Sequence, residues 1–434
     1  MTPTKRASSD RTADVVIIGA GIAGTATAYY LAKGGAKVVV CEKGVIAGEQ
    51  SSRNWGFVRQ QGRDPAEIPL MMEANKIWAG LERELNADLE WLSAGNMVTF
   101  ANDEEAAGWE DWRQLAAGYG LSAKILSRGE LDAMIPGHAL DCQGAILTES
   151  DGQAEPTKVT AALARAAEGR GAEFLTNCAV FEVERTAGAV SGVVTEHGTI
   201  RTPVVVCAAG AWSGRMLRGL GLKLPQMWIK GTVARTTPGP IVSHTATWTG
   251  VAFRQRRDGS FNIAQRSADH DLTIDSILNL PSFLGSFASN RRDIKLHLNR
   301  LSLDLFRGSF SRAALARELT TYRILDPAPN MKVVHETLQT LHRLLPETKD
   351  VTVERSWAGY IDMTPDMLPT IGAVDQPAGL ILATGFSGHG FGMGPIVGRL
   401  VAELIQNGKP SLELDAFRFS RFHDGTKLTP HSVV

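Results

Sequence analysis

Short runs of consecutive apolar residues near the start of the chain alternate with a segment of helical composition. Residues 14–19 read Asp-Val-Val-Ile-Ile-Gly, a run typical of a parallel strand that is buried on both faces. Residues 25–33 have the composition of a helix, and residues 36–41 form a second strand-like run. This order predicts a β–α–β unit with two parallel strands.

The turn between the first strand and the helix carries Gly19, Gly21 and Gly24 in a G-x-G-x-x-G pattern. The first glycine permits a tight turn, the second lets backbone approach a pyrophosphate, and the third lets the helix pack closely on the strand. Glu42 follows Gly24 by 18 residues, where a carboxylate can accept hydrogen bonds from ribose hydroxyls and would repel a 2′-phosphate. These features favour a dinucleotide site, with NADP disfavoured, over a chance glycine turn.

Three later segments complete a recognisable series. Residues 49–59 contain Ser-Ser-Arg-Asn-Trp-Gly-Phe-Val-Arg, residues 149–217 contain Cys-Ala-Ala-Gly-Ala-Trp, and residues 357–405 contain Ala-Thr-Gly-Phe-Ser-Gly-His-Gly-Phe. In this order, the chain resembles the D-amino-acid oxidase, glycine oxidase and sarcosine oxidase superfamily, most of all the sarcosine oxidases, including the β-subunit type. The resemblance implies an α/β fold with a Rossmann-like FAD-binding domain in discontinuous segments. It also implies an α+β substrate domain built on an antiparallel sheet.

The resemblance further implies which residues contact FAD. Gly359 stands where the sarcosine oxidases attach the flavin to a cysteine, so FAD is expected to bind non-covalently. The expected FAD-contacting residues are Gly19, Gly21, Gly24, Glu42, Lys43, Ser51, Arg53, Asn54, Trp55, Gly56, Val180, Ala209, Gly210, Gly359, Gly385, Gly388, His389, Gly390, Phe391, Gly392 and Met393.

Residues 385–394 alternate glycine with other residues over much of their length. Backbone without side chains can pass close to a flat ring. From Pro395 onward the apolar spacing predicts a helix, and its positive N-terminus would face that loop and stabilise an anionic reduced flavin. The alternative is a glycine-rich connection that binds no ligand.

Arginine is the natural anchor for a substrate carboxylate, because its planar fork donates two parallel hydrogen bonds. Arg59 matches the carboxylate-binding arginine of the sarcosine oxidases; the alternative is a surface arginine paired with Glu67 or Asp64. His389 is expected near the flavin edge, or else as a structural imidazole. Arg266 falls at a basic position of the family. Arg59, His389 and Arg266 are therefore the candidate catalytic residues.

Several family cations are missing. Gly392 replaces a carboxylate-binding lysine, Asn262 the lysine that promotes oxygen reduction, and Ile361 the arginine of glycine and D-amino-acid oxidases. Because Arg59 and Arg266 are present, we expect an N-substituted glycine or an imino-diacid, such as sarcosine or iminodiacetate. Three aromatic residues could either line the pocket or pack in the core: Trp55, Trp248 and Tyr360.

The leading prediction is therefore FAD-dependent oxidation of a small secondary amine or amino acid. Hydride would pass from the carbon next to nitrogen to flavin N5, and the resulting imine would be hydrolysed. Molecular oxygen would reoxidise the flavin and give H2O2. Two alternatives stay open: a dehydrogenase that passes electrons to a quinone or a protein, and a β-type flavin-binding subunit active only in a hetero-complex.

Two domains are expected. The FAD-binding domain would comprise residues 14–90, 150–225 and 335–430, and the substrate domain residues 91–149 and 226–334. Strand-like runs at 227–237 and 247–264 predict the antiparallel sheet, and Arg-Asp-Gly-Ser within the second run marks a hairpin.

Residues 272–320 depart from the family pattern and are expected to form a helical insert, with apolar residues at Leu296, Leu298, Leu301, Leu303, Leu305 and Phe306. Eight Lys and Arg stand against three acidic residues between 291 and 323. A basic amphipathic helix can lie on a membrane or contact a redox partner. The alternative is a solvated helical lid or an oligomer contact.

Composition limits the remaining classes of function. The 434 residues include 45 Lys and Arg against 46 Asp and Glu, a net charge of −1, which argues against nucleic-acid binding. The four cysteines are too few for a disulfide scaffold and lack metal-ligand spacing. The polar N-terminus lacks a signal pattern, and no apolar run could span a bilayer. A cytoplasmic protein is expected.

Overall fold

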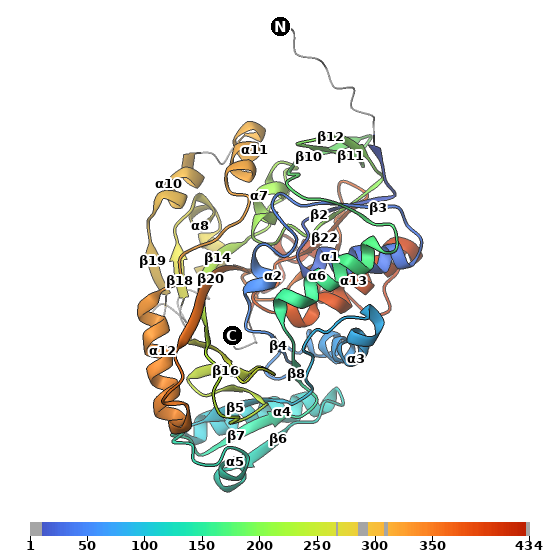
Figure 1. Cartoon of the computed structure of the whole chain (residues 1–434). Helices are drawn as coiled ribbons and strands as arrows, with labels where there is room; N and C mark the ends of the chain where they lie inside the picture. Colours follow the sequence, from blue (N-terminus) through green and yellow to red (C-terminus); the bar gives the residue numbers. More distant parts are fainter. Residues whose placement is uncertain (1–10, 266–267, 285–293, 308–310, 431–434) are drawn as a thin grey trace.

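The computed structural model describes residues 11–265, 268–284, 294–307 and 311–430. Its first layer is a six-stranded sheet (Figure 1) whose central strands are Val- and Ile-rich and buried on both faces. All neighbouring strands run parallel except the edge strand β21, which is antiparallel to β22. The spatial order is β21 (Thr370–Ala373), β22 (Leu380–Thr384), β13 (Val204–Cys207), β2 (Val15–Ile18), β3 (Val38–Cys41) and β9 (Glu173–Leu175).

Three helices pack together beside this sheet and, with it, enclose the largest hydrophobic cluster (Figure 1). They are α1 (Ile22–Lys33), α6 (Pro156–Glu168) and α13 (Gly390–Asn407). A fourth helix, α3 (Ile68–Leu85), packs on α13. The predicted β–α–β unit is thus present as β2, α1 and β3, and the α/β fold class is confirmed.

A ten-stranded, mostly antiparallel sheet forms the second layer. The predicted hairpin is present between β16 and β17. The strands are β19 (Ile294–His297), β18 (Ala268–Asp271), β14 (Met227–Thr236), β17 (Phe261–Gln265), β16 (Val251–Gln255), β15 (Ala246–Trp248), β5 (Asn96–Phe100), β7 (Gly144–Thr148) and β6 (Lys124–Ser127), with β20 (Val353–Met363) on β14. The expected limit at residue 335 assigned β20 to the FAD-binding segments, whereas its pairing places it on this sheet. The domain limits as a whole stay a prediction.

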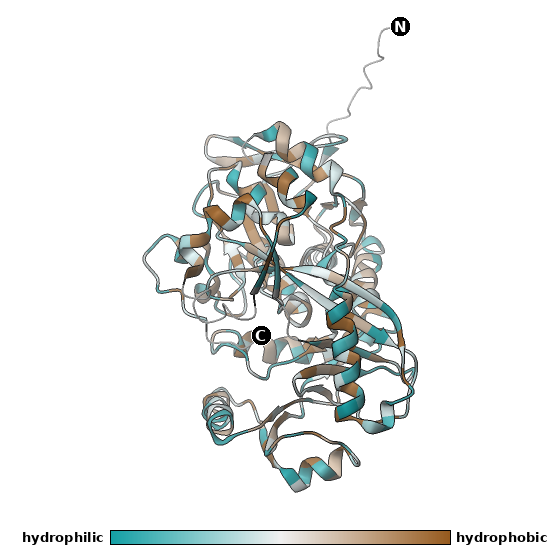
Figure 2. Ribbon diagram, turned by 90° about the vertical axis from the view of Figure 1, so that its left-hand side faces the viewer, coloured by the Kyte–Doolittle hydropathy of each residue, from teal (hydrophilic) through white to brown (hydrophobic). Residues whose placement is uncertain are grey.

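Helix α12 (Met331–Leu344) packs on one face of the ten-stranded sheet, against β14, β16 and β17 (Figure 1). Hydrophobic and hydrophilic residues alternate along it (Figure 2), and its buried side chains, which include Val334 and Leu341, join the cluster under the sheet. This amphipathic pattern is what holds the helix against the strands.

The expected insert is only partly helical. It contains α8 (Ile274–Leu278), α10 (Arg300–Arg307) and α11 (Arg312–Thr321), but also strand β19, which pairs in parallel with β18. The helical expectation is therefore wrong at Leu296, which lies in β19, and at Leu298, which lies between elements. The local spacing contains a strand pattern that the helical interpretation overlooked, because Ile294, Leu296 and Leu298 alternate with Lys295 and His297.

The remaining elements connect these layers. They are β1 (Arg11–Thr12), β12 (Gly198–Arg201), β11 (Ala189–Thr195) and β10 (Val180–Thr186) in a four-stranded sheet, β4 (Phe57–Val58) and β8 (Gly152–Gln153) in a pair, helices α2 (Gln50–Arg53), α4 (Asp103–Gly118), α5 (Arg128–Met134) and α7 (Ser213–Arg218), and short 3-10 turns at Gly210–Trp212, Pro346–Thr348, Asp415–Phe417 and Phe419–Phe422. Within the described residues, no helix has the length and apolar character needed to cross a membrane.

Candidate functional site

The glycine turn joins β2 to α1 with almost no free space around it. Gly19 has a φ of +102°, and a Cβ there would lie 2.5 Å from the carbonyl oxygen of Ala208. A Cβ on Gly24 would lie 2.0 Å from the carbonyl oxygen of Gly19. Helix α1 begins at Ile22, whose N–H donates to Ser51 Oγ at 2.8 Å, and its N-cap residue Gly21 has no side chain. The other N–H groups of the first turn and the positive end of the helix can face an anion.

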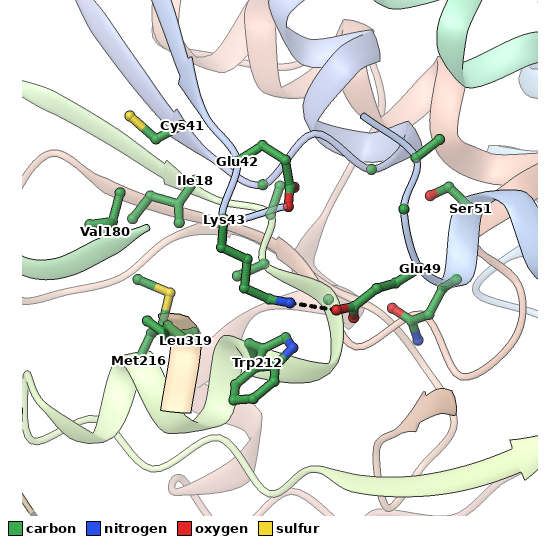
Figure 3. Close-up of a pocket in the computed structure, with 18 residues that line it drawn as sticks. Ile18, Cys41, Glu42, Lys43, Glu49, Ser51, Val180, Trp212, Met216 and Leu319 are labelled. Atoms are coloured by element: carbon green, nitrogen blue, oxygen red, sulfur yellow. Dashed lines mark hydrogen bonds and ion pairs between the residues drawn. The ribbon is translucent and has the colours of Figure 1, made fainter. Parts of the chain in front are cut away.

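A first cavity, with an empty volume of about 640 Å³, lies at the ends of β2 and β3 (Figure 3). Glu42 stands at its edge, where its carboxylate accepts hydrogen bonds from the N–H groups of Ala20 (2.9 Å) and Gly44 (2.7 Å). Burial raises the pKa of Glu42. The carboxylate is thus fixed where the sequence placed a ribose-binding acid, and Val180 lines the same cavity.

The ammonium group of Lys43 binds acceptors within the protein. Its Nζ lies 2.5 Å from Glu49 Oε1 (Figure 3) and also donates to the backbone carbonyls of Tyr322 (2.9 Å) and Arg323 (2.7 Å). Arg53, which the resemblance placed among the FAD-contacting residues, donates to Asp326 at 2.6 Å. Both side chains line a cavity, but in this structure their charged groups bind protein acceptors.

A second cavity of about 1260 Å³ lies beyond the N-terminus of α1. The two cavities share Gly21, Gln50, Ser51, Ala208 and Gly210 in their walls. Together they form one elongated site with a fixed carboxylate at one end, a helix N-terminus in the middle and a wide chamber at the other end. This arrangement fits an extended dinucleotide such as FAD, with its adenosine near Glu42 and its ring system in the second cavity.

A buried charged cluster borders the second cavity. Arg59, Arg63 and His389 line it, and Glu67 Oε1 lies 2.9 Å from His389 Nδ1. Burial lowers the pKa of Arg63 to about 9 and that of His389 to about 4, so at neutral pH the arginine is charged and the imidazole neutral. Burial also lowers the pKa of Arg59, while the nearby carboxylates of Asp151 and Glu67 oppose this.

Helix α13 begins at Gly390, five residues before Pro395, so the expected start was wrong. Gly388, His389, Gly390 and Phe391 still line the second cavity, and the positive end of the helix therefore faces it directly. Glycine and proline are poor helix formers and made this stretch resemble a loop. Packing overrides that preference, because a Cβ on Gly394 would lie 2.6 Å from Ile22 of α1.

The structure brings most of the expected residues together. Those lining the two cavities are Gly19, Gly21, Glu42, Lys43, Ser51, Arg53, Asn54, Trp55, Val180, Ala209, Gly210, Gly359, Gly388, His389, Gly390 and Phe391, together with Arg59. Those outside both linings are Gly24, Gly56, Gly385, Gly392 and Met393. Arg266 lies outside the described residues. Tyr360 lines the second cavity, as Trp55 does, whereas Trp248 stacks behind Trp55.

Two lining residues, Arg63 and Asp362, were not found from the sequence. Asp362 accepts hydrogen bonds from Gln50 Nε2 (2.8 Å), Gly385 N–H (2.9 Å) and Gln226 Nε2 (3.2 Å), and burial raises its pKa to about 6. It ties β20 to three segments around the site. The only local signal for Arg63 was its spacing of four residues from both Arg59 and Glu67.

Comparison with known proteins agrees with this site. The model of the family described as "FAD dependent oxidoreductase" (DAO) matches residues 14–404. The chain therefore belongs to the DAO family of FAD-dependent oxidoreductases, which confirms the resemblance and the cofactor.

Individual relatives are more distant. The chain is 26% identical to mitochondrial sarcosine dehydrogenase of Mus musculus over 97% of this chain, and spans 42% of that protein's length. It is 27% identical to sarcosine oxidase subunit beta of Rhizobium meliloti, covering 95% of this chain and 89% of the relative. The structure of L-amino acid deaminase from Proteus myxofaciens in complex with anthranilate superposes with a TM-score of 0.90 at 28% identity, covering 95% and 94% of the two chains.

Acid precipitation is expected to release all of the flavin into the supernatant. Gly359 lines the second cavity, and the described residues of that lining include no cysteine. Yellow colour retained in the washed pellet would contradict non-covalent binding. Flavin absorbance in both fractions, compared with the heated native protein, provides the measurement.

Proposed function

We propose that the chain oxidises a small amino acid or secondary amine that carries a carboxylate. FAD would accept hydride from the carbon next to nitrogen, and the resulting imine would be hydrolysed. The observation that supports this best is the position of Arg59, whose side chain lines the second cavity beside the N-terminus of α13. A guanidinium in that position can bind a carboxylate with two hydrogen bonds and orient the neighbouring C–H bond.

The other lining residues would control water and charge. Phe57, Val233, Ile361 and Phe386 give the cavity an apolar wall, which excludes water and strengthens the electrostatic contact of Arg59 with a carboxylate. Because His389 is neutral and hydrogen-bonded to Glu67, its proposed role is to position the first turn of α13 rather than to supply charge.

The substrate class follows from the anchor. N-substituted glycines and imino-diacids, such as sarcosine and iminodiacetate, are our first candidates, with Arg266 as the proposed second anchor for a diacid. A second class, primary α-amino acids, is favoured by the TM-score of 0.90 with an L-amino acid deaminase. Anthranilate, which that deaminase structure contains, is a suitable non-reacting probe of the cavity.

The electron acceptor is the second part of the proposal. Oxygen, giving H2O2, is the first candidate, and a quinone or partner protein is the second. The second candidate is supported by the surface of the insert, where Leu298 is 66% exposed and lies between Lys295 and Arg300 in the sequence. Such a surface suits an anionic membrane or a redox partner.

Anaerobic mixing with a panel of amines tests the substrate class. We expect sarcosine, iminodiacetate or an α-amino acid to bleach the flavin absorbance, while the matched amines without a carboxylate do not. Failure of every carboxylate-bearing amine would contradict the proposal. Peroxide formed in air by the pure protein would identify an oxidase, and turnover with an artificial dye but no peroxide would identify a dehydrogenase. A bleaching reaction that requires added partner protein would indicate a subunit of a larger complex.

A further inference from the structure

The end of the insert reaches the first cavity. Leu319 on α11 lines this cavity together with Met216 and Trp212 (Figure 3). Its side chain is 2% exposed and belongs to a hydrophobic cluster that also contains Trp212 and Leu325. The insert therefore does more than cover the protein surface, because it contributes an apolar side chain to the wall of the dinucleotide site.

The segment after α11 is bonded to the loop on the opposite side of this cavity. Lys43 Nζ donates to the carbonyls of Tyr322 and Arg323, and the Arg323 guanidinium donates to the Lys43 carbonyl at 2.7 Å. The Leu325 N–H donates to Glu49 Oε1 at 3.0 Å. The same loop continues into Gln50 and Ser51, which line both cavities, so the segment directly after the insert holds a part of the site that lies far away in sequence.

Arg323 also reaches a third wall of the cavity. Its guanidinium donates to both carboxylate oxygens of Glu196, which in turn accepts the backbone N–H of Ala179 at 3.3 Å. Ala179 precedes Val180, a residue of the cavity wall. One arginine therefore connects the loop after β3 with the start of β10, and charge-assisted bonds of this kind are the stronger class of hydrogen bond.

We propose that α11 and residues 322–325 form the outer wall of the adenosine half of the FAD site, so that the insert is a cofactor-binding element. This inference rests on FAD occupying the elongated site, and does not depend on which amine is oxidised. Leu319 would pack on the flat face of the adenine ring, while Lys43 and Arg323 hold the wall in place. Removal of the wall would speed the loss of FAD.

Replacing Arg323 by alanine is expected to raise the rate of FAD release about tenfold, because the loss of charge-assisted hydrogen bonds weakens binding on that scale. Release is followed from the holoenzyme as the recovery of flavin fluorescence after dilution. The K43M variant should show the same increase, and the K43M/R323A double variant should add little to either. The matched control is R312A, which removes an exposed ion pair between the first residue of α11 and Glu182 of β10 and should release FAD at the wild-type rate.

Two further measurements distinguish a wall from a general loss of stability. FMN lacks the adenosine half, so L319A and R323A should raise the dissociation constant of FAD and leave that of FMN unchanged. In the wild type, FAD should protect residues 312–325 from amide hydrogen exchange relative to the flavin-stripped protein. Unchanged FAD release, equal weakening of FMN and FAD, or no protection of this segment would overturn the inference. All of these readouts are independent of amine oxidation, so failure of the proposed reaction would leave them intact.

Discussion

Replacing Arg59 by methionine is expected to lower kcat/KM for a carboxylate-bearing amine by about 10²- to 10³-fold, without loss of bound FAD. The guanidinium lines the second cavity within a buried charged cluster, where truncating one partner of a buried charged contact costs about 2–5 kcal/mol. Arg59→Lys keeps the charge but loses the planar fork, so most of the activity should remain lost. Stopped-flow bleaching of the flavin, at several concentrations of the amine that reacts fastest, provides both constants.

Arg256→Met is the matched control for this prediction. Arg256 is also largely buried, but it pairs with Glu90 and Glu155 and lines neither cavity. Its replacement should change stability rather than kcat/KM. If Arg59→Met and Arg256→Met lower kcat/KM equally, or if an amine without a carboxylate loses as much rate as one with it, Arg59 is not the carboxylate anchor.

The parts of the fold that were predictable from the sequence depend on local chemistry. The run from Val15 to Ile18, the glycine turn and the run ending at Cys41 each specify their own conformation, and the β–α–β unit follows from their order. The hairpin between β16 and β17 was equally local, because Asp-Gly at its turn favours the required backbone.

The start of α13 could not be predicted in this way, and strand β19 was wrongly interpreted as helix. Gly390 and Pro395 lower helix propensity, yet the helix forms because its glycines allow contact with α1. Strand β19 was missed for a different reason. Ile294, Leu296 and Leu298 alternate with Lys295 and His297, which is the local pattern of a strand, and β18 supplies the hydrogen-bond partners. Only for α13 does an element distant in sequence decide the outcome, which is the usual limit of local propensity.

The same limit applies to the site. Glu42, Arg59 and His389 lie in recognisable motifs and were placed at the site in advance. The contact of Glu67 with His389 joins residues 322 positions apart, and that of Lys43 with Arg323 joins residues 280 positions apart. No local pattern encodes such pairs, although the contact of Lys43 with Arg323 joins the segment after the insert to the first cavity.

Replacing Gly398 by alanine is expected to lower the free energy of unfolding by about 1–3 kcal/mol, the usual cost of adding atoms to a closely packed interior. The added Cβ would lie 2.5 Å from both the carbonyl carbon and the Cβ of Ala26 on α1, so the two helices must move apart. The second cavity is lined by Gly21 and Ile22 at the start of α1 and by Gly390 at the start of α13. Movement of the two helices apart should therefore also speed FAD release.

Gly80→Ala is the control for this effect. Gly80 also lies inside a long helix, but the nearest atom to its added Cβ is Arg83 Nη2 at 3.9 Å. This variant should gain up to about 1 kcal/mol from improved helix propensity, with FAD release unchanged. Thermal unfolding and flavin fluorescence of the two variants give the comparison. Equal unfolding midpoints for Gly398→Ala and Gly80→Ala would show that Gly398 is not required for the packing of α13 on α1.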